Sequence, residues 1–146
     1  MKLTNENYYS KEANLEYMSV SQFKDFVGTY GKRACEYEAM EKLFGRWNPP
    51  PTTPLLVGSY VDSYVEGTLD SFMERHPEVF TGEGELKAPF RKAEEIIARI
   101  ERDKYFMKYL SGKKQVIMTA NFFGCDWNIK MDSYLPGVAI VDLKVM

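Results

Sequence analysis

The periodicity of the chain changes along its length, and this change restricts the folds open to it. Residues 17–110 repeat apolar side chains at helical spacing, whereas residues 114–145 alternate apolar and polar side chains as half-buried strands do. Helices that precede a separate run of strands are typical of the α+β class. We therefore expect N-terminal helices, a long amphipathic helix, and then a three-stranded antiparallel meander.

The helical part divides at glycine and proline residues. Residues 19–45 read as helix with a break near Gly31, and Ser19 and Gln22 have the spacing of a capping box. Residues 53–66 form a second helix that ends before Gly67, and residues 89–110 form the long one. Its expected buried stripe is Phe90, Ala93, Ile97, Ile100 and Met107. We expect a single domain over residues 1–146, with a helical part at 1–52 and a core at 53–146.

Composition excludes several classes of protein. Hydrophobic residues make up 45% and charged residues 27% of the chain, which suits a globular domain rather than a disordered one. We find no apolar run of membrane-spanning length and no signal peptide, so we expect a cytoplasmic protein without a membrane partner. His76 is the single histidine, which excludes zinc sites built on paired histidines.

Charge is unevenly distributed along the chain. Residues 87–114 carry 9 basic and 4 acidic side chains, a net charge of +5, whereas residues 1–86 have a net charge of −6. A basic segment in an acidic protein can be the electrostatic footprint of nucleic acid, although a solvated helix face gives the same pattern. The candidate DNA contacts are Arg91, Lys92, Arg99, Lys113 and Lys114.

The last two expected strands carry a group of charged side chains. Alternation places Asp142 and Lys144 on one face of the third strand, and a hairpin brings Asp132 of the second strand beside them. Two carboxylates at a strand edge suit Mg²⁺ or Mn²⁺, and a neighbouring lysine can orient water or stabilise charge on a phosphate. A salt bridge on a sheet face is the alternative interpretation. Asp62 and Glu66, four residues apart on the 53–66 helix, are either further metal ligands or a solvent-facing acidic pair.

The motifs "MSVSQFKDF", "ACEYEAM", "LLVGSYVDSYVEG", "IKMDSYLPG" and "AIVDLK" occur in an order that resembles the PD-(D/E)XK nuclease superfamily. More narrowly, residues 17–146 resemble phage exodeoxyribonuclease VIII-like (RecE-type) proteins and their RecB-like relatives. The resemblance implies a restriction-endonuclease-like core. It makes Asp132, Asp142 and Lys144 catalytic, and it turns the backbone carbonyl of Leu143 toward the metal.

The chain departs from this family in three places. A Gly-x-x-x-His pattern is usual in this family, and Asp62 stands at the position of its histidine. This difference leaves open whether Asp62 or Glu66 completes the metal site. Cys35 matches a position that ligates an iron–sulfur cluster in some relatives, but three further cysteines are absent, so we expect no cluster. The chain ends just after Lys144, where relatives continue with a helix and a strand. We therefore expect a core truncated after the third strand, whose open edge invites pairing.

These features predict a Mg²⁺- or Mn²⁺-dependent DNA nuclease. We expect a phage-type exodeoxyribonuclease of recombination or replication, encoded by a phage or prophage in a bacterial host. The alternative is a catalytically inactive, truncated homologue that binds and inhibits a host nuclease or CRISPR complex, an interpretation that the acidic residues 1–86 favour. The open edge strand also predicts a homo-oligomer or a partner protein.

Overall fold

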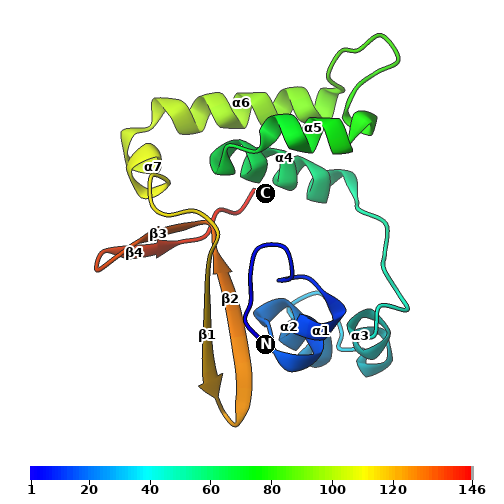
Figure 1. Ribbon diagram of the computed structural model, residues 1–146. Coiled ribbons are helices and arrows are strands. Elements are labelled where there is room, and N and C mark those ends of the chain that lie inside the picture. Colours follow the sequence, from blue (N-terminus) through cyan, green and yellow to red (C-terminus); the bar gives the residue numbers. More distant parts are fainter. Residues whose placement is uncertain (146) are drawn as a thin grey trace. The chain divides into compact units, whose positions relative to one another are not determined.

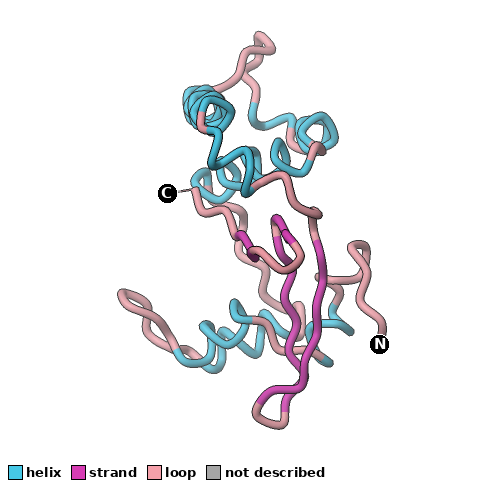
Figure 2. Tube along the Cα trace, turned by 90° about the vertical axis from the view of Figure 1, so that its left-hand side faces the viewer, coloured by secondary structure: helices cyan, strands magenta, loops and turns pink. Residues whose placement is uncertain are grey.

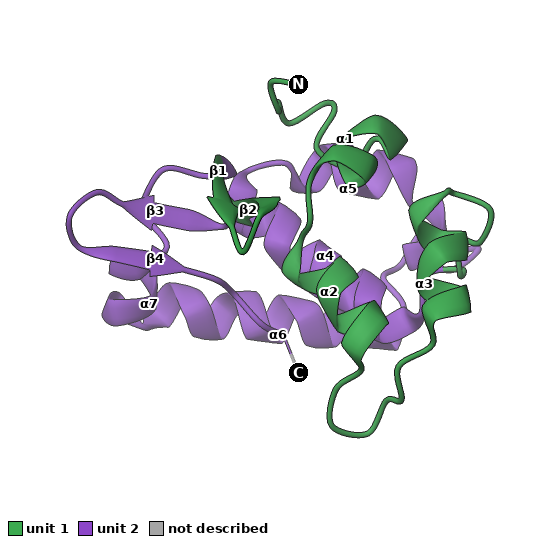
Figure 3. Ribbon diagram, turned by 90° about the horizontal axis from the view of Figure 1, so that it is seen from below, with its two compact units in different colours: residues 1–50, 117–130 green, residues 51–116, 131–146 purple. Residues whose placement is uncertain are grey.

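The computed structural model describes residues 1–145 (Figure 1), which form two compact units (Figure 3). The first unit combines residues 1–50 with residues 117–130, and the second combines residues 51–116 with those from 131 onward. The described residues form seven α-helices, one 3-10 helix and four strands, so the expected α+β class is confirmed. The single domain expected up to Met146, a residue outside the described part, stays a prediction.

Local capping sets the helices of the first unit. In the capping box predicted from the sequence, the Gln22 N–H donates to Ser19 Oγ over 3.2 Å and the Ser19 N–H donates to Gln22 Oε1 over 2.7 Å. The helix that follows ends where Gly28 takes a φ of +78°, so the expected break within residues 19–45 is confirmed. The three helices are α1 (Lys11–Glu16), α2 (Val20–Val27) and α3 (Glu36–Leu43).

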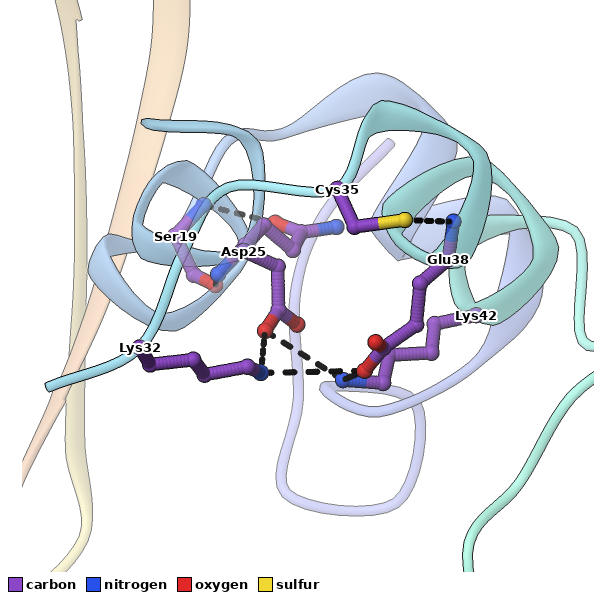
Figure 4. Close-up of polar contacts among 7 residues, drawn as sticks. Ser19, Asp25, Lys32, Cys35, Glu38 and Lys42 are labelled. Carbon is purple, nitrogen blue, oxygen red and sulfur yellow. Dashed lines mark hydrogen bonds and ion pairs between the residues drawn. The ribbon is translucent and has the colours of Figure 1, made fainter. Parts of the chain in front are cut away.

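Four charged side chains fasten α2 to α3 (Figure 4). The Asp25 carboxylate of α2 accepts hydrogen bonds from Lys32 at 3.0 Å and from Lys42 of α3 at 3.2 Å. Glu38 pairs with the same Lys42 ammonium over 2.7 Å. Burial alone would raise the pKa of Asp25, but the two ammonium groups outweigh it and lower that pKa. Cys35, drawn in the same view, accepts the N–H of Glu38 and so caps α3.

A β-hairpin forms most of the rest of the first unit (Figure 2). Its strands are β1 (Val116–Phe122) and β2 (Cys125–Met131). The turn residues Phe123 and Gly124 both have positive φ, at 53° and 72°, which is the signature of a two-residue type I′ turn. The segment before α2 joins β2, because the Met18 N–H donates to the Asp126 carbonyl over 2.7 Å.

Helices α4, α5 and α6 of the second unit lie side by side around its core (Figure 1). The core consists mainly of aromatic and branched side chains: Tyr60, Val61, Phe72, Val79, Phe90, Ala93, Ile97, Ile100 and Leu110. Its helices are α4 (Thr53–Glu66), α5 (Leu69–Arg75), the 3-10 helix η1 (Pro77–Val79), α6 (Ala88–Arg102) and α7 (Lys104–Tyr109). In the described part of the chain, no helix is both long and apolar enough to cross a bilayer.

The long helix expected over residues 89–110 is two helices. Asp103 interrupts it, because its side chain accepts the N–H groups of Tyr105 and Phe106 and thereby caps α7. The predicted stripe is buried in α6 as far as Ile100, whereas Met107, beyond the break, is 45% exposed.

The strands of the second unit form a second, separate hairpin. β3 (Ser133–Leu135) pairs antiparallel with β4 (Ala139–Val141), and Pro136 and Gly137 lie in the turn between them. The expected three-stranded meander is therefore two two-stranded sheets in the described residues. The second of the three expected strands is interrupted at Asp132, which lies between β2 and β3.

Candidate metal-binding and active site

The candidate site lies in the second unit, at the base of the β3–β4 hairpin. Val141, Leu143 and Val145 pack against the helical core, whereas Ile140 is 59% exposed. The faces predicted from alternation are therefore those observed, although β4 ends at Val141 and the following residues are extended chain outside the sheet.

The strand register brings two aspartates together. Ser133 pairs with Val141, so the next position of the same register places Asp132 opposite Asp142. The ladder stops there, because like charges directly opposite one another destabilise a strand pair. The Leu143 N–H instead donates to Oδ2 of Asp132 over 2.8 Å. This hydrogen bond fixes the Asp132 carboxylate beside Asp142.

The proximity of these side chains shifts their pKa values. Burial raises the pKa of Asp132, and the nearby Asp142 carboxylate raises it further, whereas the Leu143 N–H opposes the shift. Lys144 Nζ forms an ion pair with Asp142 Oδ2 over 2.7 Å. That ion pair, together with Asp132, raises the pKa of Lys144. The three residues predicted to be catalytic are thus neighbours.

Helix α4 adds Asp62 to this group. Its Oδ1 atom is buried and is the one such side-chain oxygen among residues 1–145 without a hydrogen-bond partner. Burial raises the pKa of Asp62 from 3.8 to about 6, and Asp132 and Glu66 contribute to the increase. Asp62 therefore does not belong to a solvent-facing acidic pair.

Glu66 is held by residues that precede β1. Gln115 Nε2 donates to Glu66 Oε1 over 2.5 Å, and Lys114 lies near both Glu66 and Asp132. The Lys114 ammonium is partly buried, which lowers its pKa, and it donates to the carbonyl of Leu110. Nothing in the sequence indicates the contact of Gln115, because the two partners lie 49 residues apart.

The carboxylate oxygens of this site suit a hard divalent cation, although most of the carboxylates already accept a hydrogen bond or ion pair from the protein. Within residues 1–145, no three His, Cys, Asp or Glu side chains are grouped so as to hold a metal ion. Asp132, Asp142 and Glu66 each accept from a donor of the protein, so an incoming cation has to compete for them. The unpartnered oxygen of Asp62 and the carboxylate oxygens of Asp132 and Asp142 nevertheless fit Mg²⁺ or Mn²⁺.

The five predicted DNA contacts fall into two environments. Arg91, Lys92 and Arg99 are exposed on α6, and Lys113 is exposed on the loop before β1. Lys114 is partly buried among carboxylates instead. The Glu94 and Glu101 carboxylates of α6 accept the hydroxyl groups of Tyr60 and Tyr64 from α4. Two of the acidic side chains of α6 are thereby engaged within the unit.

An α+β fold in which paired aspartates and an Asp-x-Lys sequence meet at the base of a hairpin defines a protein of the PD-(D/E)XK nuclease-like superfamily. The chain belongs to the family described as "PDDEXK-like domain of unknown function (DUF3799)", whose model matches residues 19–146. The superfamily predicted from the sequence is thus confirmed. Nucleases of this superfamily generally use divalent metal ions.

A solved structure supports the same assignment. The crystal structure of a "Putative exonuclease" from Eubacterium rectale is 71% identical in sequence to the chain and superposes with a TM-score of 0.95. The alignment covers 99% of this chain and 54% of that protein, so the chain spans about half of its length. No match was found among curated proteins.

Proposed function

We propose that the chain is a metal-dependent deoxyribonuclease domain of exonucleolytic type. The observation that carries this proposal is the buried, unpartnered oxygen of Asp62 beside Asp132 and Asp142. Burial of a carboxylate oxygen without a partner is unfavourable, and a bound cation would compensate for it. The similarity to a protein described as an exonuclease supports the exonucleolytic mode.

Asp62, Asp132, Asp142 and the backbone carbonyl of Leu143 are the groups proposed to hold Mg²⁺ or Mn²⁺. Asp62 is a better ligand than Glu66, because Oε1 of Glu66 already accepts the Gln115 amide. When bound, such a cation polarises a phosphoryl oxygen and lowers the pKa of a coordinated water.

Lys144 acts on the reacting groups as a cation in this proposal. In phosphodiester hydrolysis the water gives up a proton as its oxygen forms a bond to phosphorus. The bond from phosphorus to the leaving oxygen breaks, and that oxygen takes up a proton in turn. The ion pair with Asp142 raises the pKa of Lys144 and keeps it protonated. A protonated lysine can orient the water or neutralise the phosphate, whereas it cannot accept the proton of the water.

The exposed basic side chains of α6 are proposed to contact DNA phosphates. Arg91, Lys92 and Arg99 carry no sequence information in this role and serve to position the duplex. DNA binding should therefore weaken steeply as the salt concentration rises.

The direct test is degradation of end-labelled linear double-stranded DNA with Mg²⁺ or Mn²⁺, for the wild type and for Lys144→Ala. Metal-dependent loss of label that disappears in the variant is the expected result. A folded wild type that cleaves nothing with either ion would contradict the proposal. It would favour the alternative of an inactive homologue that binds and inhibits a host nuclease or CRISPR complex.

The remaining features of the proposal concern partners and origin. In the described residues β4 pairs with β3 alone, which supports pairing of its free edge with a second copy or a partner protein. Light scattering coupled to size-exclusion chromatography would test this pairing. A role in phage recombination or replication, within a bacterial cytoplasm, stays a prediction.

A further inference from the structure

Glu66 occupies a position that is unfavourable for a carboxylate. It is the last residue of α4, at the negative end of the helix dipole, which disfavours a further negative charge. Asp62, one turn earlier, adds a second negative charge on the same face. A carboxylate at this position needs a donor to hold it, and the Gln115 amide supplies one at 2.5 Å.

Gln115 adopts a backbone conformation that is rare for its residue type. Its φ of +52° lies in the left-handed region, which non-glycine residues seldom enter. Both sides of the residue are fixed: the Lys113 backbone exchanges two hydrogen bonds of 2.9 Å with Tyr134, and β1 begins at Val116. Such a conformation persists only where the surrounding structure imposes it, and it is frequent at functional sites.

We propose that Gln115 is a positioning residue of the candidate metal site, which holds the Glu66 carboxylate beside Asp62 and thereby strengthens cation binding by the three aspartates. The inference rests on the proposed function. Glu66 adds negative charge one helical turn away from Asp62, and the Gln115 amide holds the Glu66 carboxylate in place. Supporting partners of this kind typically change metal affinity by about 10–100-fold when they are removed.

Two substitutions of Gln115 separate the effect of its side-chain amide from the effect of its backbone conformation. Gln115→Gly removes the amide and accepts positive φ freely, whereas Gln115→Asn keeps an amide, tolerates positive φ, and is too short to reach Glu66. The measurement is calorimetric titration of Mn²⁺ into DNA-free protein at pH 7.5. We expect about tenfold weaker binding by both variants. Thr119→Ala, at an exposed position of β1, is the matched control and should bind as the wild type does.

A double-mutant cycle with Glu66→Gln tests whether Gln115 acts through Glu66. If it does, Gln115→Gly causes no further loss of affinity in the Glu66→Gln background. Unchanged Mn²⁺ affinity in both Gln115 variants, or losses that simply add in the cycle, would overturn the inference while leaving the proposed function intact. A wild type that binds no Mn²⁺ would overturn both.

Discussion

The backbone N–H of Leu143 donates a hydrogen bond of 2.8 Å to Oδ2 of Asp132, across 11 residues of chain. The bond stands where the strand ladder would have continued, one register position beyond the pair Ser133 and Val141. It gives the Leu143 N–H a hydrogen-bond partner although the Asp132 and Asp142 carboxylates lie opposite each other. A side chain that replaces a ladder bond in this way fixes the Asp132 carboxylate beside Asp142.

Leu143→Pro should disconnect this bond, because proline has no N–H. Relative to Leu143→Ala, we expect a loss of about 2 kcal/mol in the free energy of unfolding, the typical value for a hydrogen bond to a charged group. Leu143→Ala loses apolar contacts with the core but keeps the N–H. The increase in melting temperature on adding Mn²⁺ should therefore persist in Leu143→Ala and disappear in Leu143→Pro. An equal increase in both variants would show that the hydrogen bond does not organise the site.

Metal itself should stabilise the protein. At 100 times its dissociation constant, a cation that binds only the folded state adds about 2.7 kcal/mol. Differential scanning fluorimetry should show this increase with Mg²⁺ or Mn²⁺, and EDTA should reverse it. Asp132→Asn and Asp142→Asn should abolish the response, whereas Asp126→Asn, at an exposed position of β2, should not. A response retained by both site variants would place the metal elsewhere.

Asp62→Asn should stabilise the metal-free protein, and the gain should depend on pH. The pKa of Asp62 is raised from 3.8 to about 6, so the folded state binds this proton more tightly than the unfolded chain does. The ionised carboxylate therefore destabilises the fold above about pH 6, and this effect fades as the pH falls through 6 toward 3.8.

Because the Asp62 carboxyl is partly solvated, we expect the asparagine variant to gain about 1 kcal/mol at pH 7.5, or about 2–4 °C in melting temperature. The gain should be much smaller at pH 4. Thermal melts at the two pH values in EDTA measure it. A lower melting temperature of Asp62→Asn than of the wild type at pH 7.5 would contradict the conclusion that ionised Asp62 destabilises the metal-free fold.

Lys144→Met should separate catalysis from metal binding. The lysine occupies Oδ2 of Asp142, so its removal frees a ligand oxygen. We expect DNA cleavage to fall by at least about 100-fold, whereas Mn²⁺ affinity stays equal or increases. Lys24→Met, at an exposed position of α2, is the matched control for both measurements. Weaker Mn²⁺ binding by Lys144→Met would assign the lysine a structural role instead.

The basic face of α6 should determine the salt dependence of DNA binding. The logarithm of the DNA-binding constant falls with the logarithm of the salt concentration. The steepness of this fall should decrease by about 1 in each of three variants, Arg91→Gln, Lys92→Gln and Arg99→Gln. Fluorescence anisotropy with labelled duplex DNA measures this slope. Lys11→Gln in α1 should leave it unchanged, and an equal effect of that control would indicate a non-specific contribution of net charge.

The parts of the site that follow from local pattern could be predicted from the sequence. The period-2 alternation placed Asp142 and Lys144 on one face, and their 2.7 Å ion pair agrees with it. The hairpin turn at Pro136 and Gly137 set the register that brings Asp132 opposite Asp142. These features depend on residues near each other in the sequence, and backbone geometry then dictates where their side chains point.

Other parts of the structure required knowledge of which distant segments meet. The ending of α6 at Asp103 depended on whether that side chain would cap a new helix or continue the old one. The distinction between Asp62 and Glu66, which look equivalent on the same helix face, depended on burial of the first and on the Gln115 amide for the second.

The sequence by itself thus determined the fold class, the superfamily and the proximity of Asp132, Asp142 and Lys144, because periodicity and short motifs are properties of neighbouring residues. Only the tertiary structure decided that Asp62 is the strained acid, that Lys114 is partly buried among carboxylates, and that Gln115 holds Glu66. Burial and the pairing of polar groups arise from contacts between residues far apart in the chain, and no local pattern specifies them.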